Sequence, residues 1–193
     1  MPFHYFLPDN TVLINFSILK RHDLLGWFVR GQGAWTAGVA LECDSSARRT
    51  SLDMAPWSEI FGTPLMPTRA ERIDALIIAD GLRKPGDAGY ARHMGEAESI
   101  AIIRNRGMRA VFLTDDHDAA RAAATHSIVV ASSTKILAVA AAMDRLTHQD
   151  ARQCLADLLN QDRVLGDRPS VHEFDSEVER LRASRPGGST ARQ

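Results

Sequence analysis

Cysteine and lysine are scarce in this sequence, and each scarcity removes one kind of explanation. The 193 residues include only two cysteines, Cys43 and Cys154, which lie far apart and form no CxxC pair. A zinc site built on cysteine is therefore not expected, nor is a disulfide in a reducing compartment. Lysine occurs only at Lys20, Lys84 and Lys135, so arginine supplies nearly all of the positive charge. Arginine forks suit phosphate recognition, but a coding bias explains the same excess, so we give it little weight.

Excess charge of one sign and long apolar runs are also missing. The net charge of −1 argues against a surface that binds nucleic acid through charge alone. No uninterrupted apolar run reaches the roughly 18 residues that a membrane-spanning helix needs. The opening MPFHYFLPDN lacks the charged start and apolar stretch of a signal peptide. We therefore expect a cytoplasmic protein, and its length suits one domain with a buried core.

Short apolar segments alternate with helical patterns along the chain. Strand-like stretches stand in FHYFL, at the start of GAWTAGVALE, in RAVFLT and in SIVVA, and segments with helical periodicity follow them. Such alternation favours a parallel sheet with helices on both faces. We therefore expect an α/β fold with three layers, α/β/α.

The alternating pattern divides the chain into a main domain and a C-terminal addition. Residues 1–145 carry the pattern, and residues 146–181 are expected to form a helical extension. Residues 182–193 are polar and rich in Gly, Ser and Arg, which predicts a disordered tail. Within the main domain, residues 44–90 are interpreted as an insertion or helical elaboration, in which the prolines of residues 51–67 indicate a loop.

A helix is predicted to begin inside this insertion, at Thr68. Glu71 follows three residues later, which is the spacing of a capping box. Ile73, Leu76 and Ile77 then form an apolar stripe at helical spacing. The stripe predicts an amphipathic helix.

Acidic residues follow two of the predicted strands. Asp9 comes after the first strand, and Asp115 and Asp116 come directly after VFLT. Ligands gather at the carboxyl ends of parallel strands, so these acids converge if the two strands are neighbours. Carboxylates packed within about 5 Å repel one another, and a divalent cation removes that cost. Oxygen ligands without a His or Cys set suit Mg²⁺ or Mn²⁺ better than Zn²⁺.

Three stretches carry a resemblance to a known family. They are LPDNTVLINF, TAGVALE, and GEAESIAII followed by AVFLTDDHDAARAAATHSIVV. Their order resembles that of the PIN-domain nucleases, which place acids at a strand end, on two helices and after a later strand. The resemblance covers most of residues 1–145 and implies a PIN-like fold, with a central parallel sheet of about four or five strands. It also implies a metal-dependent ribonuclease that uses Mg²⁺ or Mn²⁺.

The resemblance assigns a role to each acid. It makes Asp9, Glu98 and Asp116 the metal ligands, with Glu42 as an auxiliary catalytic acid that binds or orients water. Glu98 is preferred to its neighbour Glu96 because ESIAII matches the acid-apolar pattern of the family helix.

Further residues beside the acids receive supporting roles. Asp116 is preferred to Asp115 because it completes Thr-x-Asp, which leaves Asp115 as an outer ligand or a helix cap. Thr114 is expected to hydrogen-bond a carboxylate. Asn10 departs from the Thr or Ser common beside the first acid.

Two alternatives remain open at this point. RIDALIIADGL also resembles the third family motif, with Asp74 in place of Glu98, although its distance from Thr114 is too long. Each acid taken singly also has a structural explanation, because Asp commonly caps helices and Glu favours a first turn. A non-catalytic PIN-fold module that binds RNA or a protein is therefore the alternative to an enzyme.

Within the family, a small chain of this kind resembles the VapC-like toxins of toxin–antitoxin pairs. That resemblance implies a cognate antitoxin, whose C-terminal segment occupies the acidic groove, and a homodimer.

Overall fold

A computed structural model describes residues 5–83, 93–163, 165–166 and 169–185 of the chain as a mixed α/β fold. Its sheet holds the parallel strands β1 (Tyr5–Pro8), β2 (Ala110–Leu113) and β3 (Val129–Ala131) in the order β1-β2-β3. The predicted α/β class with a parallel sheet is confirmed. The prediction of four or five strands is wrong for the part of the chain that the structure describes.

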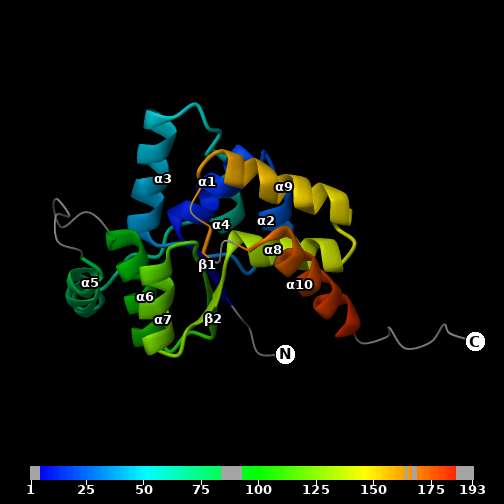
Figure 1. The fold of residues 1–193 in the computed structure, drawn as a ribbon. Coiled ribbons are helices and arrows are strands. Elements are labelled where there is room, and N and C mark those ends of the chain that lie inside the picture. The colour runs from blue at the N-terminus through cyan, green and yellow to red at the C-terminus, as the bar shows by residue number, and fades with distance from the viewer. Residues whose placement is uncertain (1–4, 84–92, 164, 167–168, 186–193) are drawn as a thin grey trace, which may run out of the picture.

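Helices surround this sheet and make up most of the described chain (Figure 1). Their bounds are α1 (Asn10–Ile18), α2 (His22–Val29), α3 (Ala37–Arg49), α4 (Pro56–Phe61), α5 (Arg69–Leu82), α6 (Met94–Asn105), α7 (His117–Thr125), α8 (Ser133–Ala142), α9 (His148–Asn160) and α10 (Val171–Ala183).

The two faces of the sheet bury two separate hydrophobic cores. Side chains alternate along β2, so Phe112 points into one core and Leu113 into the other. The first core includes Ile100 of α6 and Ala119 of α7, while the larger second core joins α1, α2, α3, α8, α9 and α10. Figure 1 shows α6 and α7 on one side of β2 and α1 and α8 on the other. Helices therefore cover both faces of the parallel sheet.

The segment expected to add a strand near Gly33 forms only single bridges. The Phe6 amide donates to the carbonyl of Gln32 at 3.0 Å, and the Ala34 amide donates to the carbonyl of Phe6 at 3.0 Å. A Cβ atom on Gly33 would lie 2.7 Å from the ring of Phe61, so this backbone packs directly against α4. Two residues beyond Ala34 the Thr36 hydroxyl caps α3, which ends the extended run. The chain therefore turns into a helix before a fourth strand can form.

The insertion is largely helical, and its second helix turns a different face inward than expected. The capping box at Thr68 and Glu71 is present, and α5 begins at the next residue. The stripe of Ile73, Leu76 and Ile77 is exposed, with Ile77 at 67%. A different set of α5 residues is buried, namely Glu71, Ala75, Ala79 and Leu82. Because Ala75 and Ala79 meet Ala97 and Ala101 of α6, the two helices pack closely and leave the larger side chains outside.

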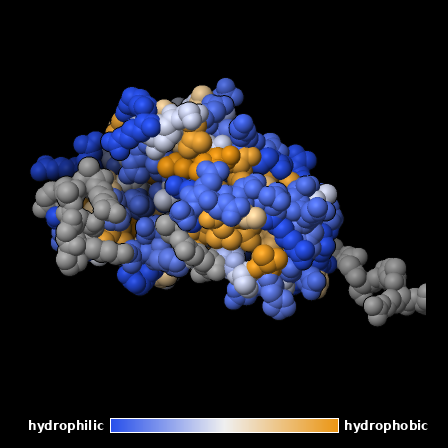
Figure 2. All heavy atoms as spheres, turned by 45° about the horizontal axis from the view of Figure 1, so that its top comes forward, coloured by the Kyte–Doolittle hydropathy of each residue, from blue (hydrophilic) through white to orange (hydrophobic). Residues whose placement is uncertain are grey.

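Two helices, α9 and α10, make up most of the described residues after Ala142. Helix α9 packs against α8, and α10 also lies along α8 with Phe174 and Val178 buried in the larger core. Helix α10 runs to Ala183, past the expected start of the tail, and residues 186–193 lie outside the described part of the chain. The described residues contain no helix that is both long and apolar enough to cross a bilayer. On the face drawn in Figure 2, hydrophobic surface is broken into patches by hydrophilic side chains.

Candidate metal centre

Asp9 stands at the junction of β1 and α1, at the carboxyl end of the sheet. It occupies the N-cap position of α1, yet its side chain makes no capping hydrogen bond. Its Oδ2 atom instead accepts hydrogen bonds from the Thr11 hydroxyl at 2.6 Å and the Thr114 hydroxyl at 3.0 Å. The side chain is almost fully buried, at 1% exposure. The capping explanation for Asp9 therefore fails, and its carboxylate is held by the two threonine hydroxyls.

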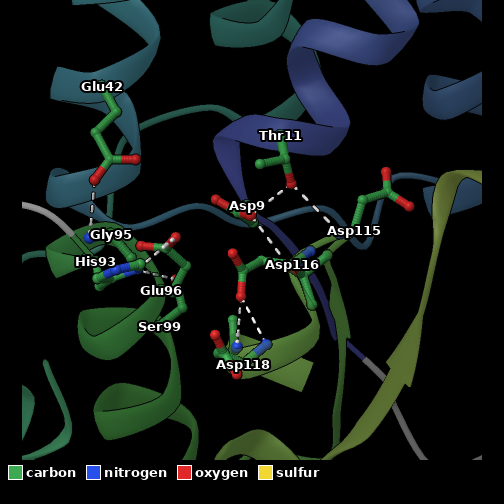
Figure 3. Close-up of polar contacts among 12 residues, drawn as sticks. Asp9, Thr11, Glu42, His93, Gly95, Glu96, Ser99, Asp115, Asp116 and Asp118 are labelled. Atoms are coloured by element: carbon green, nitrogen blue, oxygen red, sulfur yellow. Dashed lines mark hydrogen bonds and ion pairs between the residues drawn. The ribbon is translucent and has the colours of Figure 1, made fainter. Parts of the chain in front are cut away.

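Two glutamates from different helices meet Asp9. One carboxylate oxygen each of Asp9, Glu42 and Glu96 lies within 4.8 Å of the others. Glu42 comes from the middle of α3 and Glu96 from the first turn of α6. A second group at the same spacing joins Glu96 to Asp116 and His93. Glu96 belongs to both groups, so the four acids and His93 form one continuous cluster (Figure 3).

Asp116 has a structural role as well as a place in this cluster. Its Oδ1 atom accepts from the amides of Asp118 and Ala119, each at 2.8 Å, and so caps α7. The two capping bonds use the same oxygen, which leaves Oδ2 free of the cap. The capping and the metal-binding explanations of Asp116 are therefore compatible.

The close approach of α3 and α6 depends on two glycines. A Cβ atom on Gly95 would lie 2.7 Å from Oε1 of Glu42, and one on Gly38 would lie 3.2 Å from the Gly95 Cα. The Gly95 amide donates to Oε1 of Glu42 at 3.0 Å, and the Gly38 amide donates to Oε1 of Glu98 at 2.8 Å. Each helix thus gives one glutamate to the first turn of the other, where the helix dipole favours negative charge.

This reciprocal contact explains why Glu98 does not join the cluster. Glu98 was predicted to be a metal ligand, but its carboxylate is directed to the start of α3 and belongs to neither group of close ligands among the described residues. Residues two apart on a helix point in directions about 200° apart, so Glu96 and Glu98 leave α6 in different directions, although the charge of Glu98 still contributes to the raised pKa of Glu42. The structure therefore puts Glu96, the neighbour that was not preferred, where Glu98 was expected.

The rival acid Asp74 lies elsewhere on the molecule. Its Oδ2 accepts from the Asn105 amide group at 2.8 Å, at the contact between α5 and α6. It belongs to neither close group among the described residues. Asp74 therefore makes a helix–helix contact rather than a ligand set.

Burial and mutual repulsion shape the ionisation of the cluster. Burial, with a further contribution from Glu96, raises the pKa of Asp9 to about 7 despite the hydrogen bonds from Thr11 and Thr114. Burial and the charge of Asp9 likewise raise the pKa of Glu42 to about 7. At neutral pH both groups sit near their midpoints, so a nearby positive ion would strongly favour their charged forms.

Asp115 serves the scaffold beside the cluster. It is fully buried, and its carboxylate accepts from the Ser133 amide at 3.0 Å, from the Ser133 hydroxyl and from Asn15 Nδ2 at 2.8 Å. Burial raises its pKa, and these donors oppose the shift. Asp115 therefore tethers the start of α8. One expectation was that it would cap α7, a role that Asp116 fills instead.

The same network reaches into the C-terminal extension. The Gly166 amide donates to Asp115 Oδ1 at 3.3 Å, and Arg163 Nε donates to Asn15 Oδ1 at 2.7 Å. Burial lowers the pKa of Arg163, while the charges of Asp115 and Asp9 oppose that shift. The extension thus places a cation within electrostatic reach of the acidic cluster.

An open cleft of about 330 Å³ gives access to the cluster. It is lined by Asn10, Glu42, Ser45, Ser46, Arg49, His93, Glu96 and Asp116. Asn10 donates from Nδ2 to the Ser46 hydroxyl at 3.0 Å, whereas its buried Oδ1 has no hydrogen-bond partner in the described structure. The floor of the cleft is acidic, and an exposed arginine stands at its edge.

Two residues of the site were not predicted from the sequence. The Thr11 hydroxyl donates a hydrogen bond to Asp9. A Thr or Ser at the position of Asn10 was expected beside this acid. His93 has a left-handed backbone, with φ of 67°, and approaches Glu96 with 3.7 Å between Nδ1 and Oε1. The sequence signal for Thr11 was its place in Asn10-Thr11, the polar pair that follows Asp9. His93 stands three residues before Glu96, but its position depends on a turn that no sequence pattern indicated.

Comparison with known proteins adds no relative to this description: no family model, no curated protein and no solved structure matches the chain.

Proposed function

We propose that this chain is a PIN-like, metal-dependent ribonuclease, with Asp9, Glu42, Glu96 and Asp116 as its acidic site. The observation that carries the proposal is the meeting of Asp9, Glu42 and Glu96 within 4.8 Å at the carboxyl end of the sheet. The order of the acid-bearing motifs along the chain supports the same proposal. A cluster of this kind is costly to fold without a cation, because at least one carboxylate must desolvate its charge or remain protonated.

The residues fit a hard divalent cation. All the candidate acids offer oxygen, which Mg²⁺ and Mn²⁺ prefer. The unpartnered Oδ1 of Asn10 lines the same cleft and needs a hydrogen-bond donor, which a water in the cation's shell would provide. A bound divalent ion would supply Lewis-acid polarisation of a phosphodiester and a more acidic bound water. Asp9, Glu42 and Glu96, which meet within 4.8 Å, hold the ion in this proposal, and Asp116, which shares the second close group with Glu96, lies beside them.

Cations around the cleft would position an RNA backbone. Arg49 lines the cleft and is exposed, so its guanidinium can contact a phosphate without first breaking a buried ion pair. Arg163 approaches from the C-terminal extension and is fixed by Asn15. Two arginines at a local site suit a chain whose overall charge is close to zero, because they attract phosphate only where it is to be cleaved.

Cleavage assays on variants of Asp9, Glu96 and Glu98 test the proposal. We expect wild-type protein to cleave structured RNA with Mg²⁺ or Mn²⁺ and to lose activity in EDTA. Glu96→Gln and Asp9→Asn should each lower the cleavage rate at least about 100-fold, because each removes a charged ligand. Glu98→Gln keeps an oxygen that can accept from Gly38 and should retain most of the activity.

Asp74→Asn is the second matched control, since Asp74 lies between α5 and α6. Cleavage that survives EDTA, or that is lost in Glu98→Gln and retained in Glu96→Gln, would remove this assignment. RNA binding without cleavage under every metal condition would favour the alternative, a non-catalytic PIN-fold module.

The narrower biological role rests only on the resemblance of the sequence motifs. On that basis we propose that the chain is a toxin, active as a homodimer, whose cognate antitoxin covers the acidic cleft. Expression of the wild type should arrest growth and that of Asp9→Asn should not. Normal growth at equal protein levels would contradict the toxin role and leave the nuclease proposal standing.

A further inference from the structure

A second and larger cavity lies next to the acidic cluster. It has a volume of about 550 Å³, within the range of small-molecule pockets. Thr114 and His117 are among its lining residues. Thr114 also donates a hydrogen bond to Asp9, and His117 directly follows Asp116. The cavity therefore shares a hydrogen-bonded neighbour with Asp9 and a chain neighbour with Asp116, two members of the candidate metal centre.

Most of the surface of this cavity is apolar, although polar and charged side chains also line it. The apolar walls are formed by Ala120 of α7, Val130 and Ala131 of β3, Pro169, and Phe174 of α10. Three separate parts of the chain thus enclose it, including the C-terminal extension. An apolar lining of this size suits a flat ring rather than an ion.

The charged groups at its edge argue against an anion. Lys135 is paired with Glu177, which also accepts from Arg180 at 2.7 Å. Glu173 also lines the cavity, and its carboxylate accepts from the Ser170 amide at 2.7 Å. The two glutamates outnumber the one lysine, and that lysine is already in an ion pair. A phosphate would be repelled here, whereas a neutral ligand would not.

One buried hydroxyl of this cavity lacks a partner. Thr134 lies in the first turn of α8, is 8% exposed and lines the cavity. Its Oγ1 is itself buried and has no hydrogen-bond partner in the described structure, so a ligand can reach it only if the Thr134 side chain turns about χ1. A buried hydroxyl left unpaired costs roughly 1–3 kcal/mol, so a ligand with a polar edge would remove that cost on binding. The cavity therefore combines apolar walls with a polar group that can either donate or accept.

We propose that this cavity is a nucleobase pocket, which binds the base next to the phosphate cleaved at the acidic site. The proposal rests on the ribonuclease function proposed above and deepens it. The base lies between the apolar walls and hydrogen-bonds Thr134, while Thr114 links the pocket to Asp9. The pocket then contributes to the choice of cleavage position, because RNA sequence is read from unstacked single-stranded bases.

The test measures binding of the four ribonucleosides to the full chain in EDTA, by saturation-transfer NMR. We expect at least one nucleoside to bind. Thr134→Val keeps the shape of the side chain and should weaken that binding about 5-fold, as the loss of one hydrogen bond predicts. Ala120→Phe fills the cavity and should abolish it. Ala122→Phe is the matched control, because Ala122 lies on the same helix but lines a different cavity.

The outcomes separate the pocket from the reaction. Nucleoside binding by a protein that cleaves no RNA would contradict the ribonuclease proposal and support the base pocket. Cleavage of RNA without nucleoside binding, or binding unchanged in both Thr134→Val and Ala120→Phe, overturns the pocket. Displacement of the nucleoside by inorganic phosphate alone would make the cavity an anion site and overturn it as well.

Discussion

At the scale of single residues, the position of Glu42 depends on the missing side chain of Gly95. A Cβ atom there would lie 2.7 to 2.9 Å from the carboxylate of Glu42, far inside van der Waals contact. Gly95→Ala should therefore displace Glu42 and lower Mn²⁺ affinity and cleavage rate by about 10-fold or more, while the free energy of unfolding changes by less than about 1 kcal/mol because the end of the Glu42 side chain can move aside. Mn²⁺ titration followed by electron paramagnetic resonance and urea unfolding measure the two effects.

Gly81 provides the control for this substitution. It also lies in a helix, α5, and nothing would contact its Cβ within 4 Å. Gly81→Ala should raise stability by about 0.5–1 kcal/mol, since Ala loses less conformational entropy than Gly on folding. Equal effects of Gly81→Ala and Gly95→Ala on Mn²⁺ affinity and cleavage rate would contradict a specific steric role for Gly95.

The sequence predicted the kinds of residue that form the candidate site. It was less informative about which of two nearby acids on one helix would take part. Asp9 and Asp116 follow strands, and the order of strands limits where they can lie. Glu96 and Glu98 differ by two positions on one helix, and motif order does not determine the rotation of that helix about its axis. The rotation is set by the packing of Ala97 and Ala101 on α5, a tertiary contact that a short motif does not encode.

At the scale of one helix, α5 is anchored at its start by an ion pair between a buried Glu71 and an exposed Arg106. Glu71 completes the capping box, and both its oxygens accept from Arg106, with Nε to Oε1 at 2.7 Å and Nη2 to Oε2 at 3.0 Å. The Arg106 guanidinium holds the pKa of Glu71 down at about 2, below its usual 4.5. A carboxylate with a lowered pKa stabilises the fold above pH 4.5 and loses that contribution as the pH falls toward 2.

Glu71→Gln should therefore destabilise the protein at pH 7 and much less near pH 2. We expect a loss of about 1–3 kcal/mol at neutral pH, because the substitution leaves the guanidinium of Arg106 without its charged partner. Urea unfolding of both proteins across pH 2.5 to 7 (roughly the window set by the two pKa values) measures the difference. Asp80→Asn, at an exposed acid of the same helix, should change stability by less than about 0.5 kcal/mol at any pH. A constant difference for Glu71→Gln across the range would contradict the electrostatic role.

Helix starts were predictable where the signal is local. The hydroxyl of Thr68 caps α5 as expected, because the cap and the amide that it accepts from lie within a few residues, and Ser132 and Thr147 cap α8 and α9 in the same way. The buried face of α5 was not predictable in the same way. Its apolar stripe, including Ile77, is exposed because alanines of α6 select the smaller face.

At the scale of the whole molecule, the acidic cluster links pH, metal and stability. Burial raises the pKa of Asp9 to about 7 from 3.8, so its contribution to stability is present below pH 3.8 and is lost as the pH rises through about 7. In EDTA, Asp9→Asn should therefore become more stable relative to wild type as the pH rises from 4 to 8 (roughly that titration window). The expected gain in Tm at pH 8 is about 3 °C or more.

Bound Mg²⁺ should reverse the order of stability of wild type and Asp9→Asn. Millimolar Mg²⁺ at pH 8 (about the pH at which Asp9 is ionised) should raise the Tm of the wild type and leave that of Asp9→Asn nearly unchanged, because a ligand that binds only the folded state stabilises it. Differential scanning fluorimetry measures both effects. A difference between the two proteins that does not vary with pH or Mg²⁺ would show that Asp9 is not part of a cation site.

The part of the molecule least accessible to prediction was the C-terminal extension. Its helices were expected, but its contact with the site was not, since Arg163 and Asn15 are 148 positions apart. Nothing in the composition of residues 161–166 indicates that they return to Asp115. That contact exists because Asp115 is fully buried and needs donors from whatever segment covers it.

The parallel pairing of β1 with β2 sets the time at which the cluster can form during protein synthesis. The hydrogen bond from Thr114 to Asp9 spans 105 positions, so the first strand leaves the ribosome long before its neighbour exists. Contacts at such separations slow folding. A nascent chain halted before Asp116 therefore exposes its first acids without the pocket that collects them, and the acidic cluster arises only when the later part of the chain has emerged.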